Sequence, residues 1–233
     1  MNISFDNALD IAAFAVPAII AITTHEAAHG FVADKLGDDT ARRLNRVTFN
    51  PFRHIDSFGT IILPAILLIA RAPFLFGWAK PVPVNFQRLH HPRRDMVLVA
   101  AAGPGINIAL AIISAALLHL LPFFPENAAN WVALALEQSV VFNLMLAIFN
   151  MLPLPPLDGG RVAVGLLPRS LALPLARTER YGILIVLALF FLLPIVGAQL
   201  GLTLDPFGTL IGGPLRWLLH AVAWLTGHSV EGY

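Results

Sequence analysis

Cysteine is absent from this chain of 233 residues, and charged residues are scarce. Without cysteine, a disulfide framework and any thiolate metal site are excluded, which leaves histidine and carboxylate as the strong metal ligands. Only 12% of the residues are charged, against about a quarter in soluble domains, and 57% are hydrophobic. These values exclude an ordinary soluble domain and predict an integral membrane protein whose surroundings are the lipid bilayer.

A strong net charge is also lacking. The formal net charge is +1, so nothing points to nucleic acid as a partner. Residues 1–10 contain no lysine or arginine and no evident cleavage site, and the apolar run that follows ends in its own cluster of histidine and glutamate. We therefore interpret that run as a retained span and not as a signal peptide. Residues 1–233 are expected to form a single membrane domain, without repeats, linkers or any indication of an oligomeric state.

Five segments approach the roughly 20 apolar residues that a membrane-spanning helix needs. A sixth apolar stretch, residues 60–78, is interrupted by Pro64, Arg71, Pro73 and Gly77. We expect an all-α polytopic membrane protein with about five transmembrane helices and a re-entrant or interfacial segment in the broken stretch. The five predicted spans are residues 9–32, 96–121, 131–152, 181–200 and 207–225.

Lysine and arginine gather in alternate loops, which predicts the orientation of the chain. We expect the basic loops to face the cytoplasm and the N-terminus to face outward. Because basic loops flank residues 60–78 on both sides, that stretch is expected to enter and leave on the cytoplasmic side, and a single full crossing is the alternative. The basic loops are residues 34–57, 71–95 and 153–180, and the loops without lysine or arginine are residues 122–130 and 201–206.

His25, Glu26 and His29 form a His-Glu-x-x-His pattern at the end of the first predicted span. Positions four apart lie on one face of a helix, so both imidazoles are able to bind one metal ion. Glu26 lies beside them, where a general base would hold a water molecule. Ionisable residues inside a span are costly, so this cluster predicts a functional site, and a chance match on an ordinary helix is the alternative.

A catalytic zinc site uses three protein ligands, so a third is expected from another helix near the same depth. The predicted span 131–152 runs in the same direction as the first span and leads into a proline-rich stretch that ends at Asp158. Prolines stop a helix, so Asp158 is offered from a kinked segment at the depth of His29. We predict that His25, His29 and Asp158 bind one Zn²⁺ per chain; a simple turn before Gly159 is the alternative for Asp158.

The intramembrane His25-Glu26-x-x-His29 pattern, together with Asn150-x-x-Pro-x-x-Pro-Leu-Asp158-Gly, resembles the site-2 protease family of intramembrane zinc metalloproteases. Stretches at residues 50–56, 77–85 and 102–107 look like the short prokaryotic branch that lacks a PDZ domain. The resemblance covers residues 24–161 and places the catalytic core at about 9–161. The C-terminal helices, at about 181–225, resemble the family only as hydrophobic helices. In many relatives a span precedes the metal-binding helix, and none precedes it in this sequence.

The resemblance implies a role for each matched residue. It makes His25, His29 and Asp158 the zinc ligands, Glu26 the residue that activates water, and Asn150 a residue that orients the substrate or the oxyanion. An interhelical hydrogen bond is the alternative for Asn150. The implied activity is hydrolysis of peptide bonds within or near the transmembrane segments of membrane-protein substrates, in a prokaryotic cell membrane, with the active site toward the cytoplasmic side.

Residues 77–85 include Pro81 and Pro83, which disfavour a helix and predict a short extended or β element near the active site. A helical substrate hides its carbonyls in internal hydrogen bonds, so it has to be unwound before cleavage. We expect this segment to bind the unwound substrate as an added strand, with a surface linker as the alternative. The predicted substrate-binding residues are Trp78, Lys80, Val82, Val84 and Asn107.

Two further functions compete with proteolysis. Intramembrane histidine and aspartate also mark ion pathways, so a metal transporter is one alternative. A pseudo-protease that binds membrane helices without cutting them is the other.

Gly103, Pro104 and Gly105 are small or kinked residues in a predicted span. They are expected to let membrane helices approach closely, which is a packing role and not a chemical one.

Overall fold

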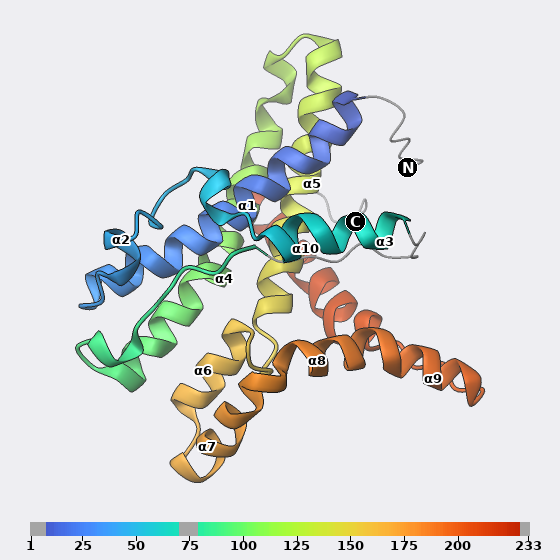
Figure 1. Ribbon diagram of the computed structural model, residues 1–233. Coiled ribbons are helices and arrows are strands. Elements are labelled where there is room, and N and C mark those ends of the chain that lie inside the picture. The colour runs from blue at the N-terminus through green and yellow to red at the C-terminus, as the bar shows by residue number, and fades with distance from the viewer. Residues whose placement is uncertain (1–7, 70–78, 229–233) are drawn as a thin grey trace.

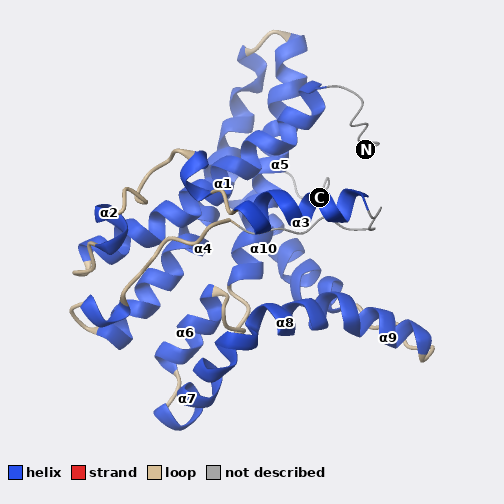
Figure 2. Ribbon diagram, viewed as in Figure 1, coloured by secondary structure: helices blue, strands red, loops and turns tan. Residues whose placement is uncertain are grey.

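The computed structural model describes residues 8–69 and 79–228, and most of this part of the chain is helical (Figures 1 and 2). No strand occurs among the described residues, so the extended or β element predicted at residues 77–85 is not confirmed. Residues 79–85 are instead an irregular segment between helices. Within the described residues, four helical stretches are long and apolar enough to cross a membrane: Leu9–Lys35, Pro92–Phe123, Ala128–Asn150 and Arg169–Gln199.

These stretches confirm the all-helical, multi-pass membrane class. They coincide with four of the predicted spans, at residues 9–32, 96–121, 131–152 and 181–200. The fifth predicted span, residues 207–225, is helical but is not among the four, so a count of five stays a prediction. Residues 70–78 lie outside the described part of the chain, so re-entry of residues 60–78 also stays a prediction.

The α-helices are joined by short π-helical and 3₁₀ stretches. The α-helices are α1 (Ala8–Lys35), α2 (Thr40–Arg43), α3 (Leu63–Ile69), α4 (Pro92–Leu117), α5 (Glu126–Asn150), α6 (Asp158–Leu166), α7 (Arg169–Arg177), α8 (Gly182–Leu187), α9 (Leu193–Gln199) and α10 (Gly213–Thr226). The π-helical stretches are Ser57–Ile62, Ala188–Leu192 and Gly208–Gly212, and the 3₁₀ stretches are Pro51–His54, Phe86–Arg88, Leu118–Phe123 and Thr178–Tyr181.

Helix ends follow local chemistry. Pro92 occupies the first turn of α4, where its missing N–H costs nothing, and Asp95 accepts a hydrogen bond from the N–H of His91 at 2.7 Å. The prolines that follow Asn150 lack an N–H and end α5. Gly227 ends α10 with φ of +76°, a left-handed conformation that glycine adopts without strain.

Helices α1, α4 and α5 pack against one another and form the centre of the molecule (Figure 1). The start of α1 and the turn between α4 and α5 lie together at the upper end of the view, so α1 and α5 run in one direction and α4 runs back (Figure 1). Small and branched residues pack where α4, α5 and α10 meet: Ala111, Ala115, Val140, Leu144 and Val222. This arrangement brings the end of α1, the start of α4 and the segment after α5 to the same region.

Helices α8 and α9 project away from the central helices, on the right in Figure 1. Apolar side chains on them and on the π-helical stretch between them are largely uncovered: Leu184 is 65% exposed, and Leu192 and Ile195 are each 56% exposed. In water such a surface would favour aggregation, but lipid tails are as apolar as leucine. The exposure therefore fits a helix that faces the bilayer.

Candidate metal centre

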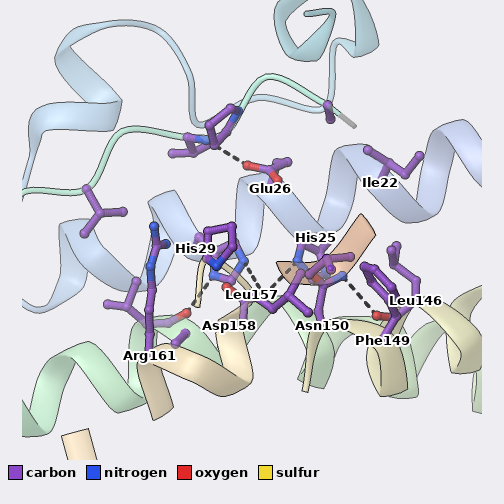
Figure 3. Close-up of a pocket in the computed structure, with 18 of the residues that line it drawn as sticks. Ile22, His25, Glu26, His29, Leu146, Phe149, Asn150, Leu157, Asp158 and Arg161 are labelled. Atoms are coloured by element: carbon purple, nitrogen blue, oxygen red, sulfur yellow. Dashed lines mark hydrogen bonds and ion pairs between the residues drawn. The ribbon is translucent and has the colours of Figure 1, made fainter. Parts of the chain in front are cut away.

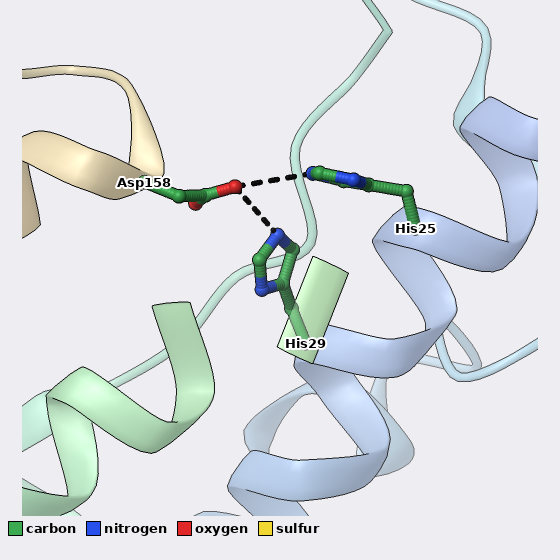
Figure 4. A group of neighbouring side chains, drawn as sticks. All are labelled: His25, His29 and Asp158. Carbon is green, nitrogen blue, oxygen red and sulfur yellow. Dashed lines mark hydrogen bonds and ion pairs between the residues drawn. The ribbon is translucent and has the colours of Figure 1, made fainter. Parts of the chain in front are cut away.

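His25, His29 and Asp158 converge in the interior of the protein (Figure 4). Asp158 Oδ2 lies 3.1 Å from His25 Nε2 and 3.2 Å from His29 Nε2, and the three candidate ligand atoms lie within 4.8 Å of one another. All three side chains are buried. The structure thus brings together residues from α1 and α6 that lie far apart in the sequence: His25 and Asp158 are 133 positions apart.

The other ring nitrogen of each histidine is held by a fixed acceptor. His29 Nδ1–H donates to the carbonyl of Val99 at 2.7 Å. His25 Nδ1 lies 2.5 Å from Asn107 Oδ1, and Asn107 Nδ2 donates to the carbonyl of Ala21 and to Asn143 Oδ1. Because the amide nitrogen of Asn107 has to face those two acceptors, its oxygen faces His25, and His25 Nδ1 carries the hydrogen.

In the neutral form of each ring, Nε2 therefore presents a lone pair toward the carboxylate of Asp158. Lone pairs that face a carboxylate at 3.1 and 3.2 Å repel it unless a proton or a metal cation lies between them. With Zn–N of about 2.0–2.1 Å, the ligand atoms of a tetrahedral site are about 3.3 Å apart, close to these separations. Two neutral imidazoles and one carboxylate are also the donor set of known catalytic zinc sites. The residues present fit a zinc ion.

Electrostatics keep Asp158 ionised. Burial raises the pKa of the Asp158 carboxyl, but its contacts with His25 and then His29 outweigh burial, so the pKa lies well below its usual range. Asp158 is also the first residue of α6, where the backbone N–H groups at the helix start favour a negative charge. The carboxylate is therefore available as a ligand at neutral pH.

Gly103 on α4 lies directly under the two imidazoles. A Cβ atom added there would lie 2.5 Å from His29 Nε2 and 2.6 Å from His25 Nε2, which is closer than real Cβ contacts. By contrast, a Cβ atom at Gly105 would meet nothing within 4 Å. The expected packing role of small residues is thus fulfilled at Gly103, and its partner is the pair of histidines.

Glycines also position Asp158. The backbone turns sharply after α5, and Gly159 and Gly160 lie so close to the backbone of Met151 and Pro155 that a side chain at either position would collide with it. This close approach returns the start of α6 to the end of α1. Asp158 follows Leu157, which has an extended conformation with φ of −64° and ψ of 158°.

Glu26 lies on a different side of α1, with its carboxylate toward the irregular segment 79–85 (Figure 3). Glu26 Oε2 accepts a hydrogen bond of 2.7 Å from the backbone N–H of Val82. Arg46 in turn donates to the carbonyls of Lys80 and Pro81, and Asp38 accepts from the N–H of Asn85. The segment is therefore held beside Glu26 at several points.

A cavity of about 400 Å³ adjoins these residues (Figure 3). Its size lies in the range of small-ligand sites. Its walls are mostly apolar, and the polar groups among them include the metal cluster, Glu26, Asn150 and Arg161. The apolar residues of the wall are Ile22, Ala79, Pro81, Val82, Val84, Phe86, Val99, Ala100, Leu146, Phe149, Pro156, Leu157, Ile183 and Val186.

The remaining predicted site residues fall into different places. Val82, Val84 and Asn150 line the cavity, and Asn150 Nδ2 donates to the carbonyl of Leu146 at 3.0 Å. Asn107 is fully buried, is not a wall residue, and holds His25. Lys80 lines a neighbouring hollow, and Trp78 lies outside the described residues. The substrate-binding role of these residues stays a prediction.

Sequence reasoning missed part of the wall. Arg161, which was counted only as a loop charge, lines the cavity and pairs with Glu179 at 3.4 Å. Ile183 and Val186 of α8 also line it, so the C-terminal part of the chain contributes to the site. Nothing in an apolar helix distinguishes wall residues from lipid-facing ones, whereas Arg161 three residues after Asp158 was a detectable signal.

A family model described as "Peptidase family M50" matches residues 126–193, a range that contains Asn150 and Asp158. The Bacillus subtilis protein named "Putative zinc metalloprotease YwhC" is 42% identical over 176 residues, which cover 74% of this chain and 77% of that protein. The Rip2 protein of Mycobacterium tuberculosis, with the same description in its name, is 29% identical over 172 residues, covering 74% of this chain and 64% of Rip2.

A further relative matches a shorter part of the chain. The Methanocaldococcus jannaschii protein named "Putative zinc metalloprotease MJ0611" is 42% identical over 64 residues, covering 28% of this chain and 31% of that protein. No solved structure matches the chain. The similarity is therefore one of sequence, and it extends over most of the chain in the Bacillus subtilis protein.

Proposed function

This chain belongs to peptidase family M50, the site-2 protease family, and is a zinc metalloprotease of a membrane; from that premise we propose that it hydrolyses peptide bonds within or beside the transmembrane segments of other membrane proteins. The observation that carries the proposal is the position of the buried His25, His29 and Asp158 cluster between membrane-spanning helices, next to a largely apolar cavity. A substrate that reaches such a cavity is an apolar segment, because polar chains are poorly accommodated by its walls.

The proposed zinc ligands are His25 Nε2, His29 Nε2 and Asp158 Oδ2. Zinc bound there supplies Lewis-acid chemistry, since it lowers the pKa of a coordinated water toward neutrality and polarises a carbonyl. The carboxylate of Glu26 accepts a proton from the attacking water and returns it to the leaving amine. The N–H of Val82 orients that carboxylate. Asn107 and the carbonyl of Val99 hold the imidazoles in the orientation that the ligands need.

The irregular segment 79–85 is suited to hold an unwound substrate. Val82 and Val84 line the cavity, and the carbonyl of Val82 and both backbone groups of Val84 have no hydrogen-bonding partner in the described part of the chain. A peptide laid along them forms backbone hydrogen bonds that do not depend on its side chains. This mode of binding suits an enzyme whose substrates share a transmembrane helix and not a sequence.

The competing functions explain less of the site. A transport path needs ligands at several depths, whereas within residues 8–69 and 79–228 His25, His29 and Asp158 are the one group of three or more His, Asp or Glu residues that could hold a metal. A binding protein without catalysis has no use for Glu26, whose carboxylate is held beside the cluster by a backbone hydrogen bond from Val82. Hydrolysis uses every one of these groups.

The proposal is tested by reconstituting the protein with a single-span model substrate and mapping the cut by mass spectrometry. We expect cleavage within the apolar span or its immediate flanks, and about one zinc per chain. The His25→Ala, Asp158→Ala double variant should lose both zinc and cleavage, because one remaining ligand does not hold the metal. His91→Ala, an exposed histidine outside the cluster, is the matched control. Cuts confined to soluble loops of the substrate would refute the intramembrane specificity.

Crosslinking tests the substrate segment. Single cysteines introduced at positions 82 to 86 of the Glu26→Gln protein should crosslink to a single-cysteine substrate with alternating strength. Val82, Val84 and Phe86 line the cavity, whereas Pro83 and Asn85 do not, so the first three positions should react more strongly. The chain has no cysteine of its own, so there is no background. Equal, weak crosslinking at all five positions would make the segment a linker.

We further propose that the metal centre lies toward the cytoplasm, as the charge distribution predicts. Arg94→Cys, at the exposed start of α4, should be protected from a membrane-impermeant thiol reagent in intact cells. Phe123→Cys should be labelled, because Phe123 is 83% exposed and lies at the other end of the helical stretch Pro92–Phe123. The expected difference is nearly complete labelling against almost none. The reverse pattern would place the metal centre on the outside.

A further inference from the structure

A second hollow lies on the other side of the segment 79–85. Its volume is about 500 Å³, and Pro81 belongs to both its wall and the wall of the catalytic cavity. We call it the basic groove and define it by its lining residues. These are Leu44, Arg46, Phe52, Arg53, Ile55, Lys80, Pro81 and Pro83. The three charged residues in this set are all basic, so the groove attracts an anion.

Arg46 is the least expected member of the groove. It is only 8% exposed, and its guanidinium has no carboxylate partner among the described residues. It donates to the carbonyls of Lys80 at 2.8 Å and Pro81 at 3.3 Å, while Nε is buried without a hydrogen-bonding partner. A buried arginine whose positive charge is balanced only by two carbonyls is costly, and a nearby anion would offset that cost.

The apolar residues of the groove indicate what carries the anion. Phe52 is 78% exposed and Leu44 57% exposed, and Phe49, shortly before Phe52, is 75% exposed. These residues follow the end of a membrane-spanning helix, where aromatic side chains insert at the level of lipid headgroups. A free soluble anion would not use such a surface. A phospholipid uses both parts, since its phosphate meets the basic residues and its acyl chains meet the aromatic ones.

We propose that the basic groove binds the phosphodiester headgroup of an anionic phospholipid. Arg53 and Lys80 contact the phosphate, Arg46 provides the positive charge beneath them, and Phe52 and Leu44 contact the upper acyl chains. The carbonyls of Lys80 and Pro81 hold Arg46, and the next residue, Val82, donates to Glu26. A bound headgroup therefore lies against the same stretch of backbone that orients Glu26. Binding itself requires no catalysis.

Fluorescence quenching in nanodiscs tests the proposal with the full chain. A fluorophore is attached to Phe49→Cys, which is then the single cysteine in the protein. Its fluorescence is quenched by a nitroxide carried near the top of the acyl chain of either phosphatidylglycerol or phosphatidylcholine. We expect the phosphatidylglycerol probe to quench at several-fold lower mole fraction than the phosphatidylcholine probe. Arg53→Gln and Lys80→Gln should each weaken that preference about fivefold, the contribution expected of one basic side chain near a lipid surface.

The control is Arg94→Gln, which removes another exposed positive charge outside the groove and should leave the preference unchanged. Arg53 is exposed and makes no ion pair in the described structure, so its substitution leaves the fold intact, as size-exclusion chromatography would verify. Equal quenching by the two probes overturns the proposal. So does an equal loss in Arg53→Gln and Arg94→Gln, which means general attraction to the surface. Displacement of the lipid by millimolar inorganic phosphate also overturns it, in favour of a free-anion site.

Discussion

Proteolysis by the Glu26→Gln variant should fall by about 10²–10⁴-fold, the usual contribution of a general base. Glu26 and Asp158 are the only carboxylates among the described residues that line the cavity, and Asp158 faces the two histidines. Glu26 is therefore the group free to accept a proton from water. A glutamine in its place has the same shape and no proton affinity at neutral pH. Zinc should remain, because Glu26 is not one of the converging ligands.

The structure explains why this substitution spares the fold. The N–H of Val82 donates to Glu26 Oε2, and a glutamine side-chain oxygen accepts the same hydrogen bond. The segment 79–85 also keeps its contacts with Arg46 and Asp38. Loss of activity in this variant thus reports the missing base and not a displaced wall. Rates are measured on the reconstituted single-span substrate, and zinc is measured on the same preparation.

Glu126→Gln is the matched control for Glu26→Gln. Glu126 is an exposed carboxylate at the start of α5, and it does not line the cavity. It should cleave at the wild-type rate. A Glu26→Gln enzyme that kept more than about a tenth of the wild-type rate would remove Glu26 from the mechanism, since a residue with that small an effect is not the base.

The metal cluster was predictable because two strong regularities meet there. Helical periodicity alone puts His25 and His29 on one face of α1. The alternation of span direction then brings the segment after α5, with Asp158, to the end of α1. Both inferences use only the helical periodicity and the thickness of the bilayer. The structure places the three side chains together.

The surroundings of the cluster were not predictable in the same way. Asn107 holds His25 through a bond between α4 and α1, and the sequence offers no register between those helices. Apolar positions in α8 are chemically alike, so nothing marks Ile183 and Val186 as wall residues among neighbours that face lipid. Which residues come into contact depends on which faces of distant helices meet. Those faces are determined by shape complementarity over many residues.

Gly103 is a second position whose packing partner could not be predicted from the sequence, and substituting it gives the most direct test of the metal centre. The sequence predicts a close helix approach at this position without naming the partner. In the structure the partners are His25 and His29, whose imidazole atoms would lie 2.5 to 2.6 Å from an added Cβ. Gly103→Ala should therefore push the imidazoles out of alignment and weaken zinc binding by about 10–100-fold, the range seen when groups that orient metal ligands are altered.

Gly105→Ala makes the comparison decisive, because it adds the same methyl group two positions along the same helix. A Cβ there meets nothing within 4 Å, so zinc affinity should be unchanged. Both variants gain helix propensity, worth about 1 kcal/mol each in a helix interior, so a loss of helix stability cannot account for a difference between them. Zinc affinity is measured by competition with a chelating dye, without any substrate. Equal zinc affinities in Gly103→Ala and Gly105→Ala would mean that the two imidazoles adjust freely. That result would contradict the inference that close packing against α4 holds the metal ligands in place.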